Sequence, residues 1–324
     1  MNLINGLEIS NLMKQESPVF ILGAPRSGTS ILYRVLQKHS SFKPKNCQDA
    51  TGVDLTESRV FREPYSVFST TSNAFKYLLC DNNSHEKFTE LSQYIQHRQR
   101  LIPGKTSLHK ILSKFHLVKI REALWKLNYN DLLLKLFFYY AKQARGSNRI
   151  LEKTPQHIFH IPEIKATFPQ AKLLFIYRHP VDVFSSYKKR LKIQENLDLK
   201  NSKRRWIQVR VNDFCHLYAK NINLALAEQA SHPEQLMCIK YENFVNNLYG
   251  EIKPILSFIG EAYEEQCIPA NDTHKSDWKV DTTLFDQIKT KTKNWSDYIN
   301  EDDARLIENE LAKVMKKLNY SRYT

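Results

Sequence analysis

The chain has 324 residues, 42% of them apolar, which is enough for a packed core in one large α/β domain or in two ordinary domains. Its longest strongly apolar stretch, residues 132–141, is interrupted by Lys135 and is too short for a membrane span, so we expect none. The formal net charge of +14 predicts an anionic partner, but interleaved acidic residues and the lack of a nucleic-acid-binding motif argue against nucleic acid.

The N-terminal residues 1–16 lack the basic-then-apolar layout of a secretory signal, and we expect them to be flexible. Five cysteines are scattered along the chain and never spaced as C-x-x-C, which predicts reduced thiols in a cytoplasmic protein. With only 8 glycines and 12 prolines, no flexible linker stands out. We therefore predict a single domain over residues 1–324.

Apolar runs followed by helical patterns recur along the chain. The expected strands are residues 18–22, 172–177 and 235–241. The helices expected after them are residues 30–38, 181–191 and 249–260. Two further helices are expected at residues 88–100 and 131–144, inside a helical insertion over residues 46–146 that would shape an acceptor pocket. This alternation predicts an α/β fold, a P-loop-type domain with a central, mostly parallel sheet flanked by helices.

The first strand–helix junction contains a phosphate-loop pattern. Gly23 and Gly28 have the G-x-x-x-x-G spacing of a P-loop, whose backbone N–H groups surround a phosphate at a helix N-terminus. Thr29 stands where nucleoside-triphosphate-binding loops carry a lysine, and the cation comes earlier, at Arg26. The loop therefore suits one phosphate bearing a further anionic group better than a triphosphate.

The second junction places cations and a hydroxyl after the strand 172–177. Arg178 follows the strand, at the edge where open α/β sheets bind ligands. Ser186 and Arg190 follow on one face of the next helix. This set fits a separate phosphate, and we expect the two junctions to meet and bind opposite ends of one nucleotide.

Four segments carry a family resemblance: PRSGTS (residues 25–30), LEKTPQH (151–157), RHPVDVFSS (178–186) and YENFV (241–245). They resemble motifs of the sulfotransferase superfamily, in particular its bacterial members related to tyrosylprotein and heparan sulfotransferases. The resemblance covers about residues 18–260. It implies that the first motif binds the 5′-phosphosulfate of 3′-phosphoadenosine 5′-phosphosulfate (PAPS) and that RHPVDVFSS binds its 3′-phosphate. The expected nucleotide contacts are Arg26, Ser27, Gly28, Thr29, Ser30, Arg178, Ser186, Arg190, Tyr241 and Lys293.

The same resemblance implies roles in sulfuryl transfer. The leaving phosphate oxygen needs a cation, for which Lys153 is the first candidate and Arg26 the second. The acceptor needs a general base, for which we prefer Glu57, with Glu63 and His157 as alternatives. The scheme requires no metal, and we expect none.

Two other classes of function compete with this interpretation. A P-loop kinase or nucleoside-triphosphatase would need a lysine at Thr29 and an acidic magnesium ligand where Arg178 stands. A nucleotide-binding protein without catalysis would tolerate loss of Lys153 and of both glutamates. The acceptor would carry a hydroxyl (or an amine), and a glycan, a phenol, a lipid and a peptide all remain open.

Overall fold

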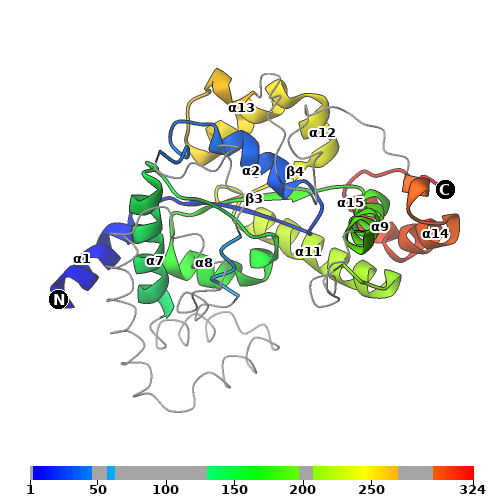
Figure 1. Ribbon diagram of the computed structural model, residues 1–324, viewed down its shortest axis with the longest axis horizontal. Coiled ribbons are helices and arrows are strands. Elements are labelled where there is room, and N and C mark those ends of the chain that lie inside the picture. Colours follow the sequence, from blue (N-terminus) through cyan, green and yellow to red (C-terminus); the bar gives the residue numbers. More distant parts are fainter. Residues whose placement is uncertain (1–2, 46–56, 63–129, 197–206, 269–294) are drawn as a thin grey trace, which may run out of the picture. The chain divides into compact units, whose positions relative to one another are not determined.

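The computed structural model describes residues 3–45, 57–62, 130–196, 207–268 and 295–324 (Figure 1). Its four strands are β1 (Val19–Gly23), β2 (Leu151–Lys153), β3 (Lys172–Tyr177) and β4 (Leu236–Lys240). They form one parallel sheet in the order β2-β1-β3-β4. The predicted α/β class is therefore confirmed.

The strands form where the sequence is almost continuously apolar. Every residue of β1 is buried, as are the four central residues of β3, because helices cover a parallel sheet on both faces. β2 was not predicted as a strand, since it has only three residues and two of them are charged. Its pairing with β1 aligns Leu151 with Val19 and Lys153 with Ile21.

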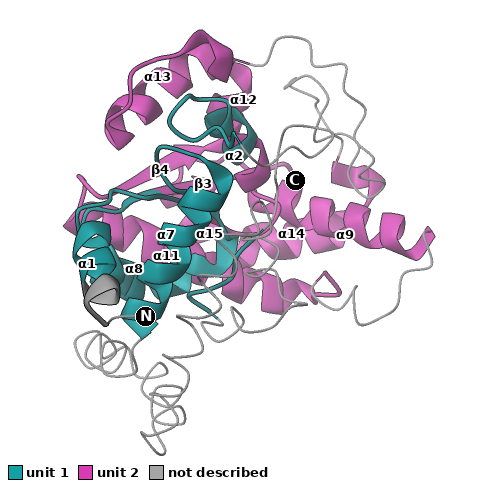
Figure 2. Cartoon of the chain, turned by 60° about the vertical axis from the view of Figure 1, so that its left-hand side comes forward, with its two compact units in different colours: residues 1–21, 33–173 teal, residues 22–32, 174–324 magenta. Residues whose placement is uncertain are grey.

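The chain divides into two compact units. Unit 1 comprises residues 1–21 and 33–173, and unit 2 comprises residues 22–32 and 174–324 (Figure 2). The described helices of unit 1 include α1 (Leu3–Lys14), α7 (Asn130–Arg145), the 3-10 helix η3 (Pro155–His160) and α8 (Ile161–Thr167). Helix α7 packs against both α1 and α8. Helix α1 covers most of the N-terminal residues 1–16 that we expected to be flexible, so this segment is largely helical.

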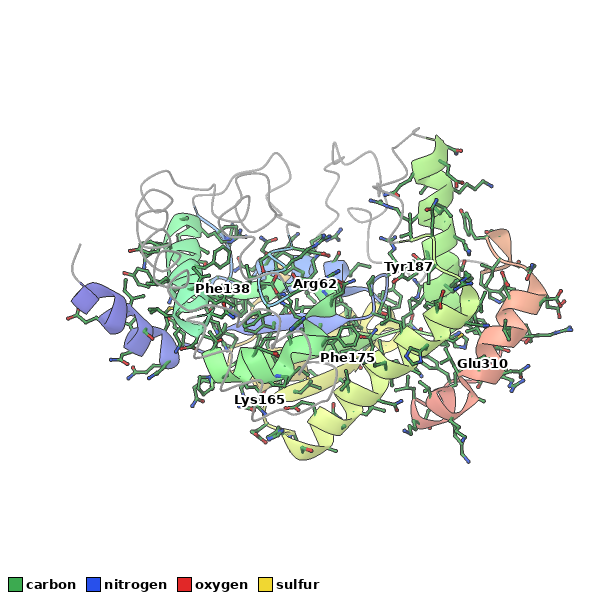
Figure 3. The ribbon with its side chains drawn as sticks, turned by 90° about the horizontal axis from the view of Figure 1, so that it is seen from below. Arg62, Phe138, Lys165, Phe175, Tyr187 and Glu310 are labelled. Atoms are coloured by element: carbon green, nitrogen blue, oxygen red, sulfur yellow. The ribbon has the colours of Figure 1, made fainter. Side chains whose placement is uncertain are left out.

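The core of unit 1 is built from aromatic rings. The ring centroid of Phe20 in β1 lies 5.6 Å from that of Phe61 and 5.9 Å from that of Phe138 in α7 (Phe138 is labelled in Figure 3). Both contacts are edge-to-face. Phe168, after α8, lies 5.5 Å from Phe138. This cluster anchors the segment 57–62 next to β1.

Unit 2 contains the remaining helices. They are α9 (Pro180–Asn196), α11 (Val211–Ser231), α12 (Tyr241–Asn246), α13 (Leu248–Ile259), α14 (Glu301–Glu310), α15 (Ala312–Lys317) and the 3-10 helices η4 (Glu265–Cys267) and η6 (Trp295–Asp297). Helices α11 and α12 pack against β4, and α9 packs against α14 and η6. Helix α2 (Thr29–Gln37) begins in unit 2 directly after the phosphate loop. No helix in the described part of the chain is long and apolar enough to cross a membrane.

We predict that Phe20→Ala lowers the free energy of unfolding by about 3–5 kcal/mol, because it opens a cavity among three aromatic neighbours. Urea denaturation would measure the change. Leu12→Ala is the control, since Leu12 is 57% exposed and should change the free energy by less than about 0.5 kcal/mol. Equal losses in the two variants would contradict this description of the core.

Candidate active site

The phosphate loop has a backbone shape suited to an anion. β1 ends at Gly23, and α2 starts at Thr29. Between them Arg26 has a φ of 72° and Gly28 a φ of 105°, both in the left-handed region. The N–H of Ser27 donates to the carbonyl of Ala24 at 3.1 Å, which closes the turn. The N–H of Ile31 donates to the carbonyl of Gly28 at 3.0 Å, whereas the N–H groups of Thr29 and Ser30 precede the first helical hydrogen bonds and are available to an anion.

The side chain of Ser27 also fits a ligand in this loop. The residue is fully buried, and its Oγ has no hydrogen-bond partner among the described residues. A buried hydroxyl normally has a partner, because leaving it without one costs free energy. A phosphate oxygen would supply that partner. Thr29 is also buried, and Ser30 is half-buried.

The second junction is held by contacts on both sides of Arg178. Its guanidinium lies 3.3 Å from the carboxylate of Asp182 and 4.7 Å from the ring centroid of Tyr241. Its backbone carbonyl accepts a hydrogen bond from the hydroxyl of Tyr218 at 2.5 Å. These contacts hold Arg178 in place, and about 12% of its side chain stays exposed. A guanidinium held in this way could bind an anion such as a phosphate.

The two junctions meet inside unit 2, so the expected approach of their side chains is confirmed. Arg26 Nε donates to Ser186 Oγ of α9 at 3.1 Å, across 160 residues of sequence. Tyr241, the first residue of α12, lies against Gly28, where an added Cβ would stand 2.4 Å from its ring. Burial raises the pKa of the Tyr241 hydroxyl, although Arg178 opposes the shift. Five of the expected nucleotide contacts thus form one cluster.

A second cluster lies in unit 1 at the end of β2. Lys153 Nζ donates to Glu57 Oε1 at 2.9 Å. The lysine side chain is 3% exposed and the glutamate side chain is 28% exposed, so the carboxylate is the more accessible group. Arg59 also approaches Glu57, at 3.7 Å. The pair joins the preferred cation candidate to the preferred base candidate.

The other candidates are placed differently. Arg190 lies on α9, one turn beyond Ser186, with a half-buried side chain. His157 is fully buried, with Nδ1 3.1 Å from Glu152 Oε2, which does not favour it as the base. Glu63 and Lys293 lie outside the described residues.

Sequence reasoning missed the carboxylate of Glu152. This side chain is fully buried and accepts hydrogen bonds from Ser58 and Thr154 besides facing His157. Burial by itself opposes ionisation, but His157 and these hydrogen bonds hold the pKa of Glu152 below its ordinary value. An acidic residue directly before Lys153, in a segment flanked by apolar residues, was the available signal.

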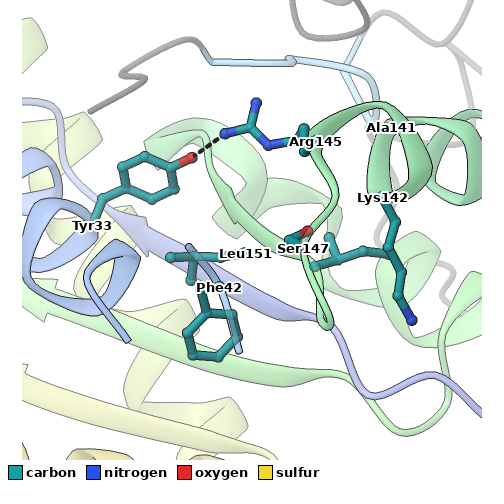
Figure 4. Close-up of a pocket in the computed structure, with 8 residues that line it drawn as sticks. Tyr33, Phe42, Ala141, Lys142, Arg145, Ser147 and Leu151 are labelled. Carbon is teal, nitrogen blue, oxygen red and sulfur yellow. Dashed lines mark hydrogen bonds between the residues drawn. The ribbon is translucent and has the colours of Figure 1, made fainter. Parts of the chain in front are cut away.

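No other described feature offers a comparable site. In unit 1, a pocket beside α7 is lined by residues that include Tyr33 and Arg145, whose side chains are 3.5 Å apart (Figure 4). Its volume of about 10 Å³ corresponds to a single water, which is too small for a nucleotide. Within the described ranges, no group of three His, Cys, Asp or Glu side chains is arranged to hold a metal ion.

Comparison with known proteins gives a consistent result. A family model described as "Sulfotransferase family" matches residues 18–265. The omega-hydroxy-beta-dihydromenaquinone-9 sulfotransferases Stf3 of Mycobacterium bovis and Mycobacterium tuberculosis are each 21% identical over 343 aligned positions, covering 99% of this chain and 80% of theirs. The crystal structure of sulfotransferase STF9 from Mycobacterium avium has a TM-score of 0.51 at 12% identity, covering 98% of this chain and 81% of that one.

We predict that Gly28→Ala lowers the free energy of unfolding by about 3 kcal/mol, because the new Cβ adds overpacking against Tyr241 to the strain of a positive φ. Gly260→Ala is a matched control. Gly260 also has a positive φ, of 79°, but nothing lies within 4 Å of an added Cβ, so we expect a loss of only about 1 kcal/mol. Urea denaturation of both variants measures the difference, and equal losses would show that Tyr241 does not restrict this position.

Proposed function

The chain belongs to the sulfotransferase family and transfers a sulfuryl group, and from this premise we propose that its donor is PAPS and that its acceptor carries a hydroxyl group. The observation that carries the proposal is the contact between the two junctions of unit 2. A donor with anionic groups at both ends needs two separate phosphate sites at a fixed spacing, and the bond from Arg26 to Ser186 joins two such sites.

The charges of the cluster match those of the donor. PAPS carries about four negative charges when its phosphomonoester is counted as two. The loop from Ser27 to Ser30 offers N–H groups, hydroxyls and a helix N-terminus for the 5′-phosphosulfate. Arg178 and Ser186 offer a cation and a hydroxyl for the 3′-phosphate. Tyr241, a half-buried side chain that lies against both Gly28 and Arg178, would keep the two sites at their spacing.

A P-loop kinase or nucleoside-triphosphatase is not favoured. The family match supports sulfuryl transfer rather than phosphoryl transfer. Thr29 replaces the lysine that would bind a triphosphate, and Arg178 stands where a magnesium ligand would be needed.

We assign the transfer step to the pair of Lys153 and Glu57. In this step the S–O bond to the leaving phosphate breaks, a new S–O bond forms to the acceptor, and the acceptor proton passes to a base. Glu57 is accessible enough to receive that proton, which would end its attraction to Lys153. At the same stage negative charge develops on the leaving oxygen, and an ammonium group has three donors with which to stabilise it. The pair therefore links proton removal to leaving-group stabilisation.

The remaining assignments stay predictions. Arg26 is the second candidate for the leaving-group cation, and Glu63 remains an alternative base. Arg190 and Lys293 remain candidate nucleotide contacts. A cytoplasmic location accords with Cys215, Cys238 and Cys267 being outside any disulfide bond. A hydroxyl acceptor accords with the Stf3 relatives, whose name specifies an omega-hydroxy compound.

We predict that 3′,5′-adenosine bisphosphate binds the protein in the absence of metal, and more tightly than ATP with magnesium. Isothermal titration calorimetry measures both affinities. Arg178→Ala and Ser186→Ala should each weaken binding of the bisphosphate by about 10–100-fold, because each removes a hydrogen bond to a charged group.

Arg210→Ala is the control for this experiment. Arg210 also belongs to unit 2 and pairs with an aspartate, but its side chain is 88% exposed and should leave the affinity unchanged. Tighter binding of ATP with magnesium would contradict the proposal, as would wild-type affinity in Arg178→Ala.

We predict that Lys153→Ala changes the dissociation constant of the bisphosphate by only a few fold but lowers kcat by on the order of a hundredfold or more. The expected reason is loss of charge stabilisation at the leaving oxygen. Release of radiolabelled bisphosphate from PAPS, with a phenol, a primary alcohol and a hexose supplied as acceptors, measures turnover. Lys142→Ala is the control, since Lys142 also pairs with a glutamate in unit 1. Normal turnover by Lys153→Ala would remove this lysine from the mechanism.

A further inference from the structure

The segment 57–59 is joined to the segment 152–154 residue by residue. The Oγ and the backbone N–H of Ser58 both donate to Glu152 Oε1, at 2.6 and 3.2 Å. The N–H of Arg59 donates to Thr154 Oγ1 at 3.2 Å. Lys153 lies between Glu152 and Thr154 in the chain, and its partner Glu57 directly precedes Ser58. The catalytic pair is therefore set within hydrogen bonds made by its immediate neighbours.

Glu152 is the centre of this arrangement. Its Oε1 also accepts from Thr154 Oγ1 at 2.6 Å, so one oxygen receives three donors. Its Oε2 faces His157 Nδ1 at 3.1 Å, and both side chains are fully buried. His157 is itself in contact with the ring of Phe61, 5.2 Å away in an edge-to-face arrangement. A carboxylate with so many partners has one defined position.

A further contact lies just beyond the C-terminal ends of the two segments. Arg62 donates a hydrogen bond to the side chain of Gln156 (Figure 3 labels Arg62). This hydrogen bond is exposed to solvent, where water competes for both groups and the net contribution to stability is small. Packing of Phe61 in the aromatic core anchors the segment 57–62 as a whole, and the buried contacts of Glu152 add a hydrogen-bonded attachment at Ser58 itself.

We propose that Glu152 is a positioning residue, whose carboxylate holds Ser58 so that Glu57 reaches Lys153 in the geometry that transfer requires. It acts through its neighbours and touches neither donor nor acceptor. The importance of this geometry for catalysis rests on the roles proposed above for Lys153 and Glu57. The effect on the pair itself does not rest on them, because it is a property of the protein without substrate.

Ser58→Ala tests the proposal with little disturbance of the fold. It removes the Oγ donor at 2.6 Å but keeps the backbone N–H bond to Glu152. In the wild type the Lys153 side chain is 3% exposed, which should limit its acetylation by acetic anhydride. We expect this acetylation to rise by about tenfold in Ser58→Ala, as measured by peptide mass spectrometry. Labelling of Lys142, which pairs with Glu16 in the same unit, should not change.

The same variants are then assayed with nucleotide. Ser58→Ala and Glu152→Gln should bind 3′,5′-adenosine bisphosphate like the wild type but show a kcat about tenfold lower. Ser58→Thr, which keeps the hydroxyl, should recover most of the loss. Ser147→Ala, another buried serine of unit 1, should behave like the wild type. If Glu152→Gln does not fold, Ser58→Ala and Ser58→Thr still give the comparison.

The outcomes separate the two proposals. Unchanged labelling of Lys153 in folded Ser58→Ala would overturn the positioning role of Glu152, whatever the enzyme does with PAPS. Increased labelling with an unchanged kcat would overturn its relevance to transfer. A wild-type protein that neither binds the bisphosphate nor consumes PAPS would overturn the proposed function, while the labelling result would still decide whether Glu152 positions the pair.

Discussion

The candidate nucleotide site depends on one close approach, that of the Tyr241 ring to Gly28. The space on the loop side admits no Cβ, and Arg178 stacks 4.7 Å from the centroid of the same ring. One aromatic side chain therefore contacts both the loop after β1 and the residue after β3. The bond from Arg26 to Ser186 adds a polar contact between the same two junctions. Adjacent parallel strands bring their carboxyl ends to one edge of the sheet, and this side-chain packing sets the spacing of the two candidate anion sites.

The proposed transfer chemistry depends on a different kind of constraint, the position of Lys153 relative to Glu57. Lys153 is nearly buried, and burying an unpaired ammonium would be costly, so the ion pair with Glu57 offsets part of that cost. The pair would be of little use if its two members were free to separate. The hydrogen bonds of Glu152, Ser58 and Thr154 hold the neighbouring backbone in a defined position. Glu152 is a second carboxylate close to the pair, and its burial is tolerated because Ser58, Thr154 and His157 are its own hydrogen-bonding partners.

Much of this could be predicted from the sequence, and the remainder had physical reasons to be missed. The strands with continuous apolar runs and the junction residues Arg26, Arg178 and Ser186 followed from local patterns. β2 did not, because a three-residue strand with two charged side chains is stabilised by pairing with β1 rather than by its own composition. The choices of Glu57 as base and of Lys153 as cation came only from family resemblance, and their contact was not predicted, since the two residues are 96 positions apart. Glu152 was overlooked because a buried carboxylate is recognised by its partners, which the sequence alone does not bring together.

A crystal structure of the protein with 3′,5′-adenosine bisphosphate would test the central claim most directly. The account predicts the 5′-phosphate on the N–H groups at the start of α2, with Ser27 Oγ as a donor, and the 3′-phosphate on Arg178 and Ser186. A bisphosphate bound with only one phosphate in this cluster, or bound elsewhere on the protein, would contradict it.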